Sequence, residues 1–172
     1  RKAVWALALS AAAVLVYLSF RFEFKYAAIA VVAVLHDVAI TLGYVAWTGI
    51  ELDASFVAVI LTLVGYSLNA TIVIFDRVRE LLRLNQRESL VEVVNRAVRD
   101  TMARSINTNL TTLLVIVALT LFGGATIRNF ASSLMVGIIA GTYSSVFISS
   151  PLWALWQQRS ESRSRVAAKA VG

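Results

Sequence analysis

Cysteine is absent from this 172-residue chain, and histidine occurs once, as His36. Without a thiol, the sequence excludes disulfide bonds and thiolate chemistry. His36 and Asp37 have no further ligands that would complete a metal site. Ser67 follows a glycine at position 65, but no second glycine follows it as in the nucleophile motif of intramembrane serine proteases. We therefore expect no enzymatic activity, no bound metal and no cofactor.

Charge is also scarce. Charged residues make up 15% of the chain and hydrophobic residues 59%, with a mean hydropathy of +0.76. A soluble domain is only about 45–50% apolar. The net charge of +6 comes from arginines at the ends of apolar runs, which fits membrane topology better than nucleic-acid binding. The composition thus predicts a polytopic membrane protein.

Several apolar runs are long enough to cross a bilayer, which requires about 20 residues. The expected spans are Ala3–Phe20, Tyr26–Trp47, Ser55–Phe75, Ile106–Phe122 and Phe130–Trp156. The runs show no alternation of period two, so we expect helices rather than barrel strands. The predicted fold is an all-α transmembrane bundle over residues 1–156, followed by a basic tail at 157–172. Arg1-Lys2 before an apolar run is similar to a signal peptide, but no small-residue cleavage site follows, and we expect a fragment of a longer protein.

The connector at 76–105 is the one sizeable polar stretch between spans. Its apolar residues recur at roughly helical spacing: Leu90, Val93, Val94, Ala97 and Met102. This pattern predicts an amphipathic helix lying on the cytoplasmic interface. A plain surface connector is the alternative.

The distribution of cations predicts orientation. Arg21, Lys25, seven arginines from Arg77 to Arg104 and four tail cations lie on one side, against Arg1, Lys2 and Arg128 on the other. The positive-inside rule places the first group in the cytoplasm. We therefore expect a periplasmic N-terminus for this sequence and a cytoplasmic C-terminus.

Polar residues inside the expected spans are the candidate functional residues. Asp37 is the only acid within a span, where an ionised aspartate costs about 2.5–3.5 kcal/mol. It is either part of a hydrogen-bonded structural pair with His36 or a group that responds to protons. The next span contains a polar group formed by Ser67, Asn69 and Thr71. Such side chains need a partner helix or water, so we expect a helix–helix working surface.

Arg104 opens the fourth span and precedes a polar stripe. The stripe comprises Asn107, Thr108, Asn109, Thr111 and Thr112. Asn107 and Thr111 are four residues apart and share a helix face. An arginine that extends to lipid phosphates is the alternative to a functional cation.

Small residues recur every fourth position in the last span, at Ser133, Gly137, Gly141, Ser145 and Ser149. This pattern predicts close helix packing, with a sliding surface for conformational change as the alternative. Pro151 is expected to kink the helix or to end its regular part.

Several motifs follow one another along the chain: Leu35-His36-Asp37-Val38, Gly65–Glu80, Arg104-Ser105-Ile106-Asn107-Thr108, Thr111-Thr112-Leu113-Leu114, Leu121-Phe122-Gly123-Gly124 and Gly137–Ser150. By these motifs the sequence resembles the SecF family of bacterial protein-export subunits. The resemblance implies spans two to six of a six-helix half of the resistance-nodulation-division superfamily. The first span and a large periplasmic domain would precede Arg1. It also implies a role in protein translocation through SecYEG, driven by the proton motive force with a SecD-like partner, in the bacterial inner membrane.

The resemblance assigns expected roles to residues and shows one departure. Arg104 matches an arginine implicated in proton passage, but Ala70 stands where SecF proteins commonly have an aspartate. The acid would then come from the SecD-like partner, unless the position has been altered. Water along the route would be bound by Asn69, Thr71, Asn107 and Thr111, with Asp37 as a secondary or structural acid. The periplasmic domain would hold the emerging preprotein. An exporter of lipids or small hydrophobic molecules and a purely structural subunit remain as alternatives.

Overall fold

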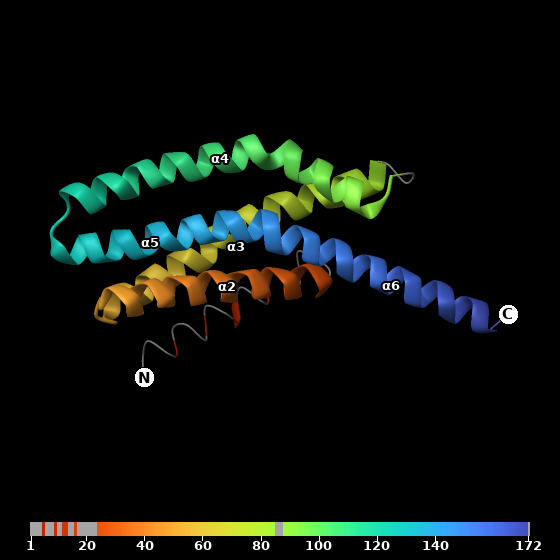
Figure 1. Ribbon diagram of the computed structural model, residues 1–172, viewed down its shortest axis with the longest axis horizontal. Coiled ribbons are helices and arrows are strands. Elements are labelled where there is room, and N and C mark those ends of the chain that lie inside the picture. The colour runs from red at the N-terminus through yellow and green to blue at the C-terminus, as the bar shows by residue number, and fades with distance from the viewer. Residues whose placement is uncertain are drawn as a thin grey trace.

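The computed structural model describes residues 24–84 and 88–171, together with five isolated positions nearer the N-terminus. The expected span Ala3–Phe20 therefore lies almost wholly outside the described residues. The elements are α2 (Phe24–Thr48), α3 (Ala54–Leu84), α4 (Leu90–Phe122), α5 (Ala125–Ser144), the π-helical turn η1 (Ser145–Ser149) and α6 (Ser150–Val171). In this part of the chain there is no strand, and the all-α prediction is confirmed (Figure 1).

Four segments are long and apolar enough to cross a membrane: Lys25–Thr48, Ala54–Leu84, Leu90–Phe122 and Ala125–Ser160. They contain the four expected spans that begin at Tyr26, Ser55, Ile106 and Phe130. In Figure 1, α5 lies between α4 and α2, and it contacts α3 as well. α5, η1 and α6 follow one another without a loop, and α6 slants away from the direction of α5 (Figure 1). The expected tail at 157–172 continues this helix as far as Val171.

Local sequence explains where the helices begin and end. α2 ends at Thr48, and the next residue, Gly49, has a φ of 70° that residues with a Cβ rarely adopt. The side chain of Asp53 accepts a hydrogen bond from the backbone N–H of Phe56 at 3.1 Å and so caps the start of α3. Ser89 and Glu92 form a capping box at the start of α4.

The connector differs from its prediction. The apolar face predicted in 76–105 lies on the first part of α4 rather than on a separate helix, and an amphipathic helix on the membrane interface is not shown among the described residues. α3 continues to Leu84, and α4 begins at Leu90 and runs into the span without interruption, since no glycine or proline occurs between positions 90 and 122. The apolar face at Val93, Val94 and Ala97 is buried in a core cluster with residues of α2, α3 and α6.

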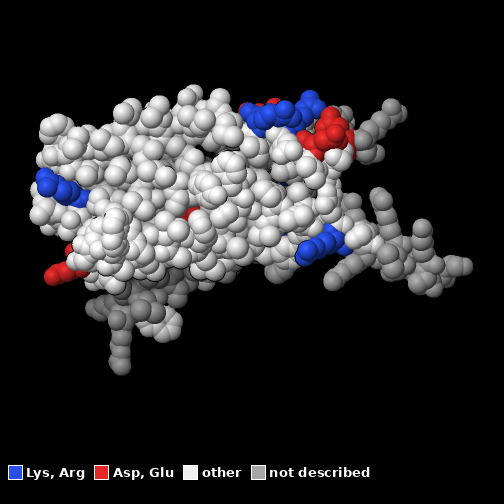
Figure 2. Space-filling model, in the orientation of Figure 1, with Lys and Arg blue, Asp and Glu red and all other residues white. Residues whose placement is uncertain are grey.

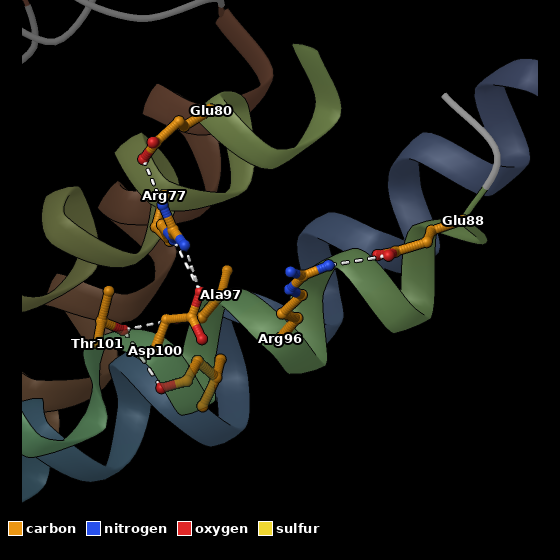
Figure 3. Close-up of polar contacts among 8 residues, drawn as sticks. Arg77, Glu80, Glu88, Arg96, Ala97, Asp100 and Thr101 are labelled. Atoms are coloured by element: carbon orange, nitrogen blue, oxygen red, sulfur yellow. Dashed lines mark hydrogen bonds and ion pairs between the residues drawn. The ribbon is translucent and has the colours of Figure 1, made fainter. Parts of the chain in front are cut away.

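An ion pair joins the extended ends of α3 and α4, with two further pairs nearby among the described residues. Arg77 of α3 donates to Asp100 of α4 at 2.6 Å and to Glu80 at 2.7 Å (Figure 3). Arg96 donates to Glu88 at 2.9 Å. We call this end of the bundle, which carries Arg77 and Asp100, the charged end. Figure 2 shows charged side chains gathered toward the ends of the molecule, with an almost uncharged belt between them.

The apolar core is divided into two clusters. One lies toward the charged end and includes Tyr26, Phe75 and Trp153. The other includes Val59 and Ile138 and lies toward the opposite end. Along α3, the buried polar residue Ser67 falls between Val59 and Phe75. A polar layer therefore separates the two clusters, and it contains Asp37.

Candidate functional site

Asp37 is completely buried at a point where three helices meet. Its Oδ2 atom accepts a hydrogen bond from Ser67 Oγ of α3 at 2.5 Å and from Ser144 Oγ of α5 at 2.9 Å. A buried carboxylate is tolerated when several donors meet it. Asp37 thus joins α2, α3 and α5 through hydrogen bonds at the centre of the bundle.

His36 contacts its neighbour. Its Nδ1 atom lies 3.0 Å from Asp37 Oδ1, although adjacent helical residues point about 100° apart. The imidazole is 34% exposed, whereas the carboxylate is not exposed at all. Ser67, in turn, bonds the carboxylate rather than the imidazole. His36 therefore connects the buried acid to the surface of this bundle, and the arrangement differs from a serine–histidine pair.

The small residues of α5 allow this helix to approach Asp37 and Ser67 closely. A Cβ atom at Gly141 would lie 3.3 Å from both Asp37 Oδ2 and Ser67 Cβ. A Cβ atom at Gly137 would lie 2.8 Å from Leu63 Cδ1 and 3.0 Å from Thr41 Oγ1. We call the residues Ser133, Gly137, Gly141, Ser145 and Ser149 the ridge. At Gly137 and Gly141 the ridge packs against α2 and α3 of the same chain.

The rest of the ridge is also buried and continues through η1. Ser133, Ser145 and Ser149 are at most 2% exposed. Pro151, one residue beyond the start of α6, has no N–H to donate to the preceding turn. The regular helix ends at Ser144, and Ser150 Oγ donates to the carbonyl oxygen of Ser145 at 2.9 Å. The π-helical turn is thus the response of this helix to the proline.

Three buried polar atoms near this turn have no hydrogen-bond partner in the described residues: Thr71 Oγ1, Ser149 Oγ and Trp153 Nε1. Their side chains belong to residues that are at most 2% exposed. A buried donor or acceptor without a partner costs about 1–3 kcal/mol. All three follow the Asp37 layer on the side of the charged end.

A second polar group lies on the outer face of α3 and α4. Arg104, Asn69 and Ala70 line a hollow of about 170 Å³ between the two helices. Arg104 is exposed, and it has no hydrogen-bonded or ionic partner within the described part of the chain. Tyr66 Oη joins the helices here by donating to Thr112 Oγ1 at 2.7 Å. We call this surface the α3–α4 face.

The structure divides the predicted proton-pathway residues into two sets. Asn69, Arg104, Asn107 and Thr111 are exposed on α3 and α4, whereas Asp37 and Thr71 are buried inside the bundle. Asn109, from the same polar stripe, points inward and donates to Thr142 Oγ1 at 2.7 Å. Ala70 lines the same hollow as Arg104, so the departure from the family pattern occurs beside the cation.

Sequence reasoning missed Ser144 as a partner of Asp37. It also treated Ser67, Asn69 and Thr71 as one group. Ser67 and Thr71 are four residues apart and share a face, while Asn69 is about 200° away from each. This spacing was sufficient to separate the two sets. Among the described residues, no group of three histidine, cysteine or acidic side chains could hold a metal ion.

Comparison with known proteins identifies the family of this chain. Residues 1–159 match the family model for "Protein export membrane protein SecD/SecF, C-terminal". The chain belongs to the SecD/SecF family. It is 47% identical to the protein translocase subunit SecF of Alicyclobacillus acidocaldarius over 99% of this chain and 56% of that protein. It is 46% identical to the SecF subunit of Sebaldella termitidis over 88% of this chain and 50% of that protein.

Solved SecDF structures have the same fold. A crystal structure of SecDF in a super-membrane-facing form matches 95% of this chain and 22% of its own, with a TM-score of 0.90 and 39% identity. SecDF from Thermus thermophilus, described as a translocon-associated membrane protein, matches 92% of this chain and 22% of its own, with a TM-score of 0.89 and 41% identity. The chain spans about half the length of the SecF relatives that it matches.

Proposed function

We propose that this chain is the membrane part of a SecF-like subunit that assists protein translocation across the bacterial inner membrane. A SecD-like partner covers the α3–α4 face, and the proton motive force drives the cycle. The observation that carries the proposal is Arg104, an arginine without a partner in the described residues, beside Ala70 on a polar face of two spanning helices. Relatives named SecDF, including that of Bacillus subtilis at 40% identity, support the pairing.

The energetics of the α3–α4 face favour a protein partner over lipid. Asn69, Asn107 and Thr111 are exposed on helices that are long and apolar enough to span. Polar side chains in contact with hydrocarbon are unfavourable. In the most apolar stretch of α4 only 11% of residues are buried, against 33 to 50% in the other three candidate spans. α4 is therefore the helix best placed to meet another subunit.

Arg104 then has a defined role. The partner supplies the carboxylate that Ala70 cannot, and the guanidinium stabilises its ionised form. When that carboxylate takes up a proton, its attraction to Arg104 is lost and the two subunits repack. One charge that crosses the membrane supplies about 2.3 kcal/mol per 100 mV. No covalent chemistry is part of this cycle, and the chain is not an enzyme.

The remaining parts of the proposal concern orientation and partners. The charged end, with Arg77 and most other cations, faces the cytoplasm by the positive-inside rule. The turn at Gly49 faces the periplasm. The SecYEG channel and the emerging preprotein interact with regions of the complete protein that include a periplasmic domain, and the described bundle supplies the coupling.

Three substitutions test the role of Arg104. Arg104→Gln in the complete protein should abolish the stimulation of preprotein export by a proton gradient while the complex with the SecD-like partner still forms. Arg104→Lys should retain part of the stimulation, because the positive charge remains but the planar guanidinium, which can bind both oxygens of a carboxylate, is lost. Ala70→Asp should keep or raise the stimulation, since Arg104 offsets part of the burial cost of the new charge.

The control is Arg128→Gln, which removes an exposed cation of α5 that is far from this face along the chain. Gradient-dependent export is measured in inverted membrane vesicles for each variant. Normal stimulation in Arg104→Gln would mean that the arginine is only an interfacial anchor. Loss of stimulation in Arg128→Gln as well would show that general charge, rather than this face, matters.

A further inference from the structure

We propose that Asp37 is a proton-binding site inside this chain, reached from the charged end by water molecules held at Thr71, Ser149 and Trp153. The site is separate from the α3–α4 face and requires no residue of a partner. Its use in translocation rests on the proposed proton-driven function. Proton binding itself can be measured without export.

Two of the three buried polar side chains without partners in the described residues lie one turn beyond the two serines that donate to Asp37. Thr71 follows Ser67 by four residues and lies one turn closer to the charged end on the same face of α3. Ser149 follows Ser144 by five residues, which is one turn of the π-helical segment η1. Ser67 and Ser144 are the two donors to Asp37. Each donor is thus followed by a buried hydroxyl that has no partner among the described residues.

Small side chains of α2 lie between Asp37 and the charged end. Tyr26, Ala30, Ala33 and Asp37 are all buried on one face of this helix. The two alanines therefore occupy the layer between Asp37 and the aromatic group at the charged end. Tyr26 stacks on Trp153 and meets the edge of Phe75, both with ring centroids 5.1 Å apart. Phe75 and Trp153 are one turn beyond Thr71 and Ser149, respectively.

These residues define a short passage with two ends. Asp37 and its serine donors form the inner end, and the three aromatic rings close the outer end. Tyr26 and Asp37 are eleven positions apart on α2, a rise of about 16 Å along the helix, and the proposed waters lie within this length beside Thr71 and Ser149. A buried water needs two to four polar partners, and the hydroxyls of Thr71 and Ser149 with the N–H of Trp153 supply them.

No other charge competes for this proton. His36 is the only charged or titratable side chain that contacts Asp37 within the described residues. Between Ser55 and Phe75 of α3, and between Asn129 and Gln158 of α5 to α6, the sequence has no acidic residue, lysine, arginine or histidine. His36 reaches the surface on the other side of the carboxylate. A proton taken up from the passage therefore resides on Asp37 or passes to His36.

Infrared difference spectroscopy on the complete protein with its SecD-like partner, reconstituted in liposomes, tests the proposal with the proton itself as the probe. Acidification should produce a carboxylic-acid band that is absent in Asp37→Asn. Thr71→Val and Ser149→Ala should leave the final band unchanged but slow its appearance by about tenfold, the effect of one lost buried hydrogen bond. Thr71→Ser should restore the native rate, and this result would show that the fold is intact.

The matched control is Thr62→Val, because Thr62 is exposed on the same helix. It should keep the native rate, as should Arg104→Gln, which separates this site from the α3–α4 face. Absence of an Asp37-dependent band would overturn the proton site. A native rate in both Thr71→Val and Ser149→Ala would overturn the water passage. Export in Arg104→Gln can be normal or lost without affecting either conclusion.

Discussion

The glycines of this chain give the sharpest test of how α5 packs. A methyl group at Gly137 would lie 2.8 Å from Leu63 Cδ1, and Leu63 is not exposed at all, so it has no free space to move into. A methyl group at Gly141 would lie 3.3 Å from the carboxylate of Asp37, which two serines hold in place. At Gly43 and Gly65 a methyl group would meet nothing within 4 Å.

The magnitude follows from these contacts. Extra methyl groups in a packed core cost about 1–3 kcal/mol, whereas alanine in place of an open helical glycine gains about 1 kcal/mol. Gly137→Ala should therefore be less stable than Gly65→Ala by about 2–4 kcal/mol. Gly141→Ala should lie between them, because its contacts are less severe. Gly43→Ala should behave as Gly65→Ala does.

The assay is reversible unfolding of the purified complete protein by SDS in mixed micelles, followed by far-UV circular dichroism. Equal free energies of unfolding for the four variants would refute the packing of α5 against α2 and α3. A larger loss at Gly65 than at Gly137 would mean that the rotation of α5 or α3 about its axis is wrong.

Three further predictions concern topology and cross-helix bonds. The chain has no native cysteine, so Leu84→Cys should react only with a thiol reagent added from the cytoplasmic side, and Thr48→Cys only with one added from the periplasmic side. The reverse pattern would overturn the orientation. Tyr66→Phe should lower the free energy of unfolding by about 1 kcal/mol, because its hydroxyl joins α3 to α4. Thr142→Val should cost about 1–3 kcal/mol in the same assay, because the amide of Asn109 loses its partner.

The sequence was a good guide to properties that depend on local hydropathy. Four spans were placed correctly because an apolar run of sufficient length has few alternatives to a membrane helix. In the connector at 76–105 the sequence predicts the apolar helix face, but an amphipathic pattern does not say what that face meets. That face at Val93 and Ala97 meets a protein core rather than a membrane surface.

Contacts that depend on how each helix is rotated about its own axis are harder to predict from the sequence. The bond between Asp37 and Ser144 joins residues 107 positions apart, and no local pattern specifies it. The separation of Thr71 from Asn69, by contrast, follows directly from the helical period. Arg104 is a candidate because the polar stripe at Asn107–Thr112 follows it, since a cation at the start of a span is by itself common.

The π-helical turn before Pro151 has a consequence for how this helix tolerates insertions and deletions. A stripe with four-residue spacing drifts around a regular helix, since each turn takes 3.6 residues. The wider turn at Ser145–Ser149 contains one residue more than a regular turn. This additional residue offsets the drift, so that Ser149 and Trp153 remain buried. Deletion of one residue within the turn, together with Pro151→Ala, should thus convert it to regular helix and leave the side chains of α6 facing as before. Deletion of one residue in the middle of α5 would instead rotate everything beyond it by about 100° and carry the serine that holds Asp37 out of reach.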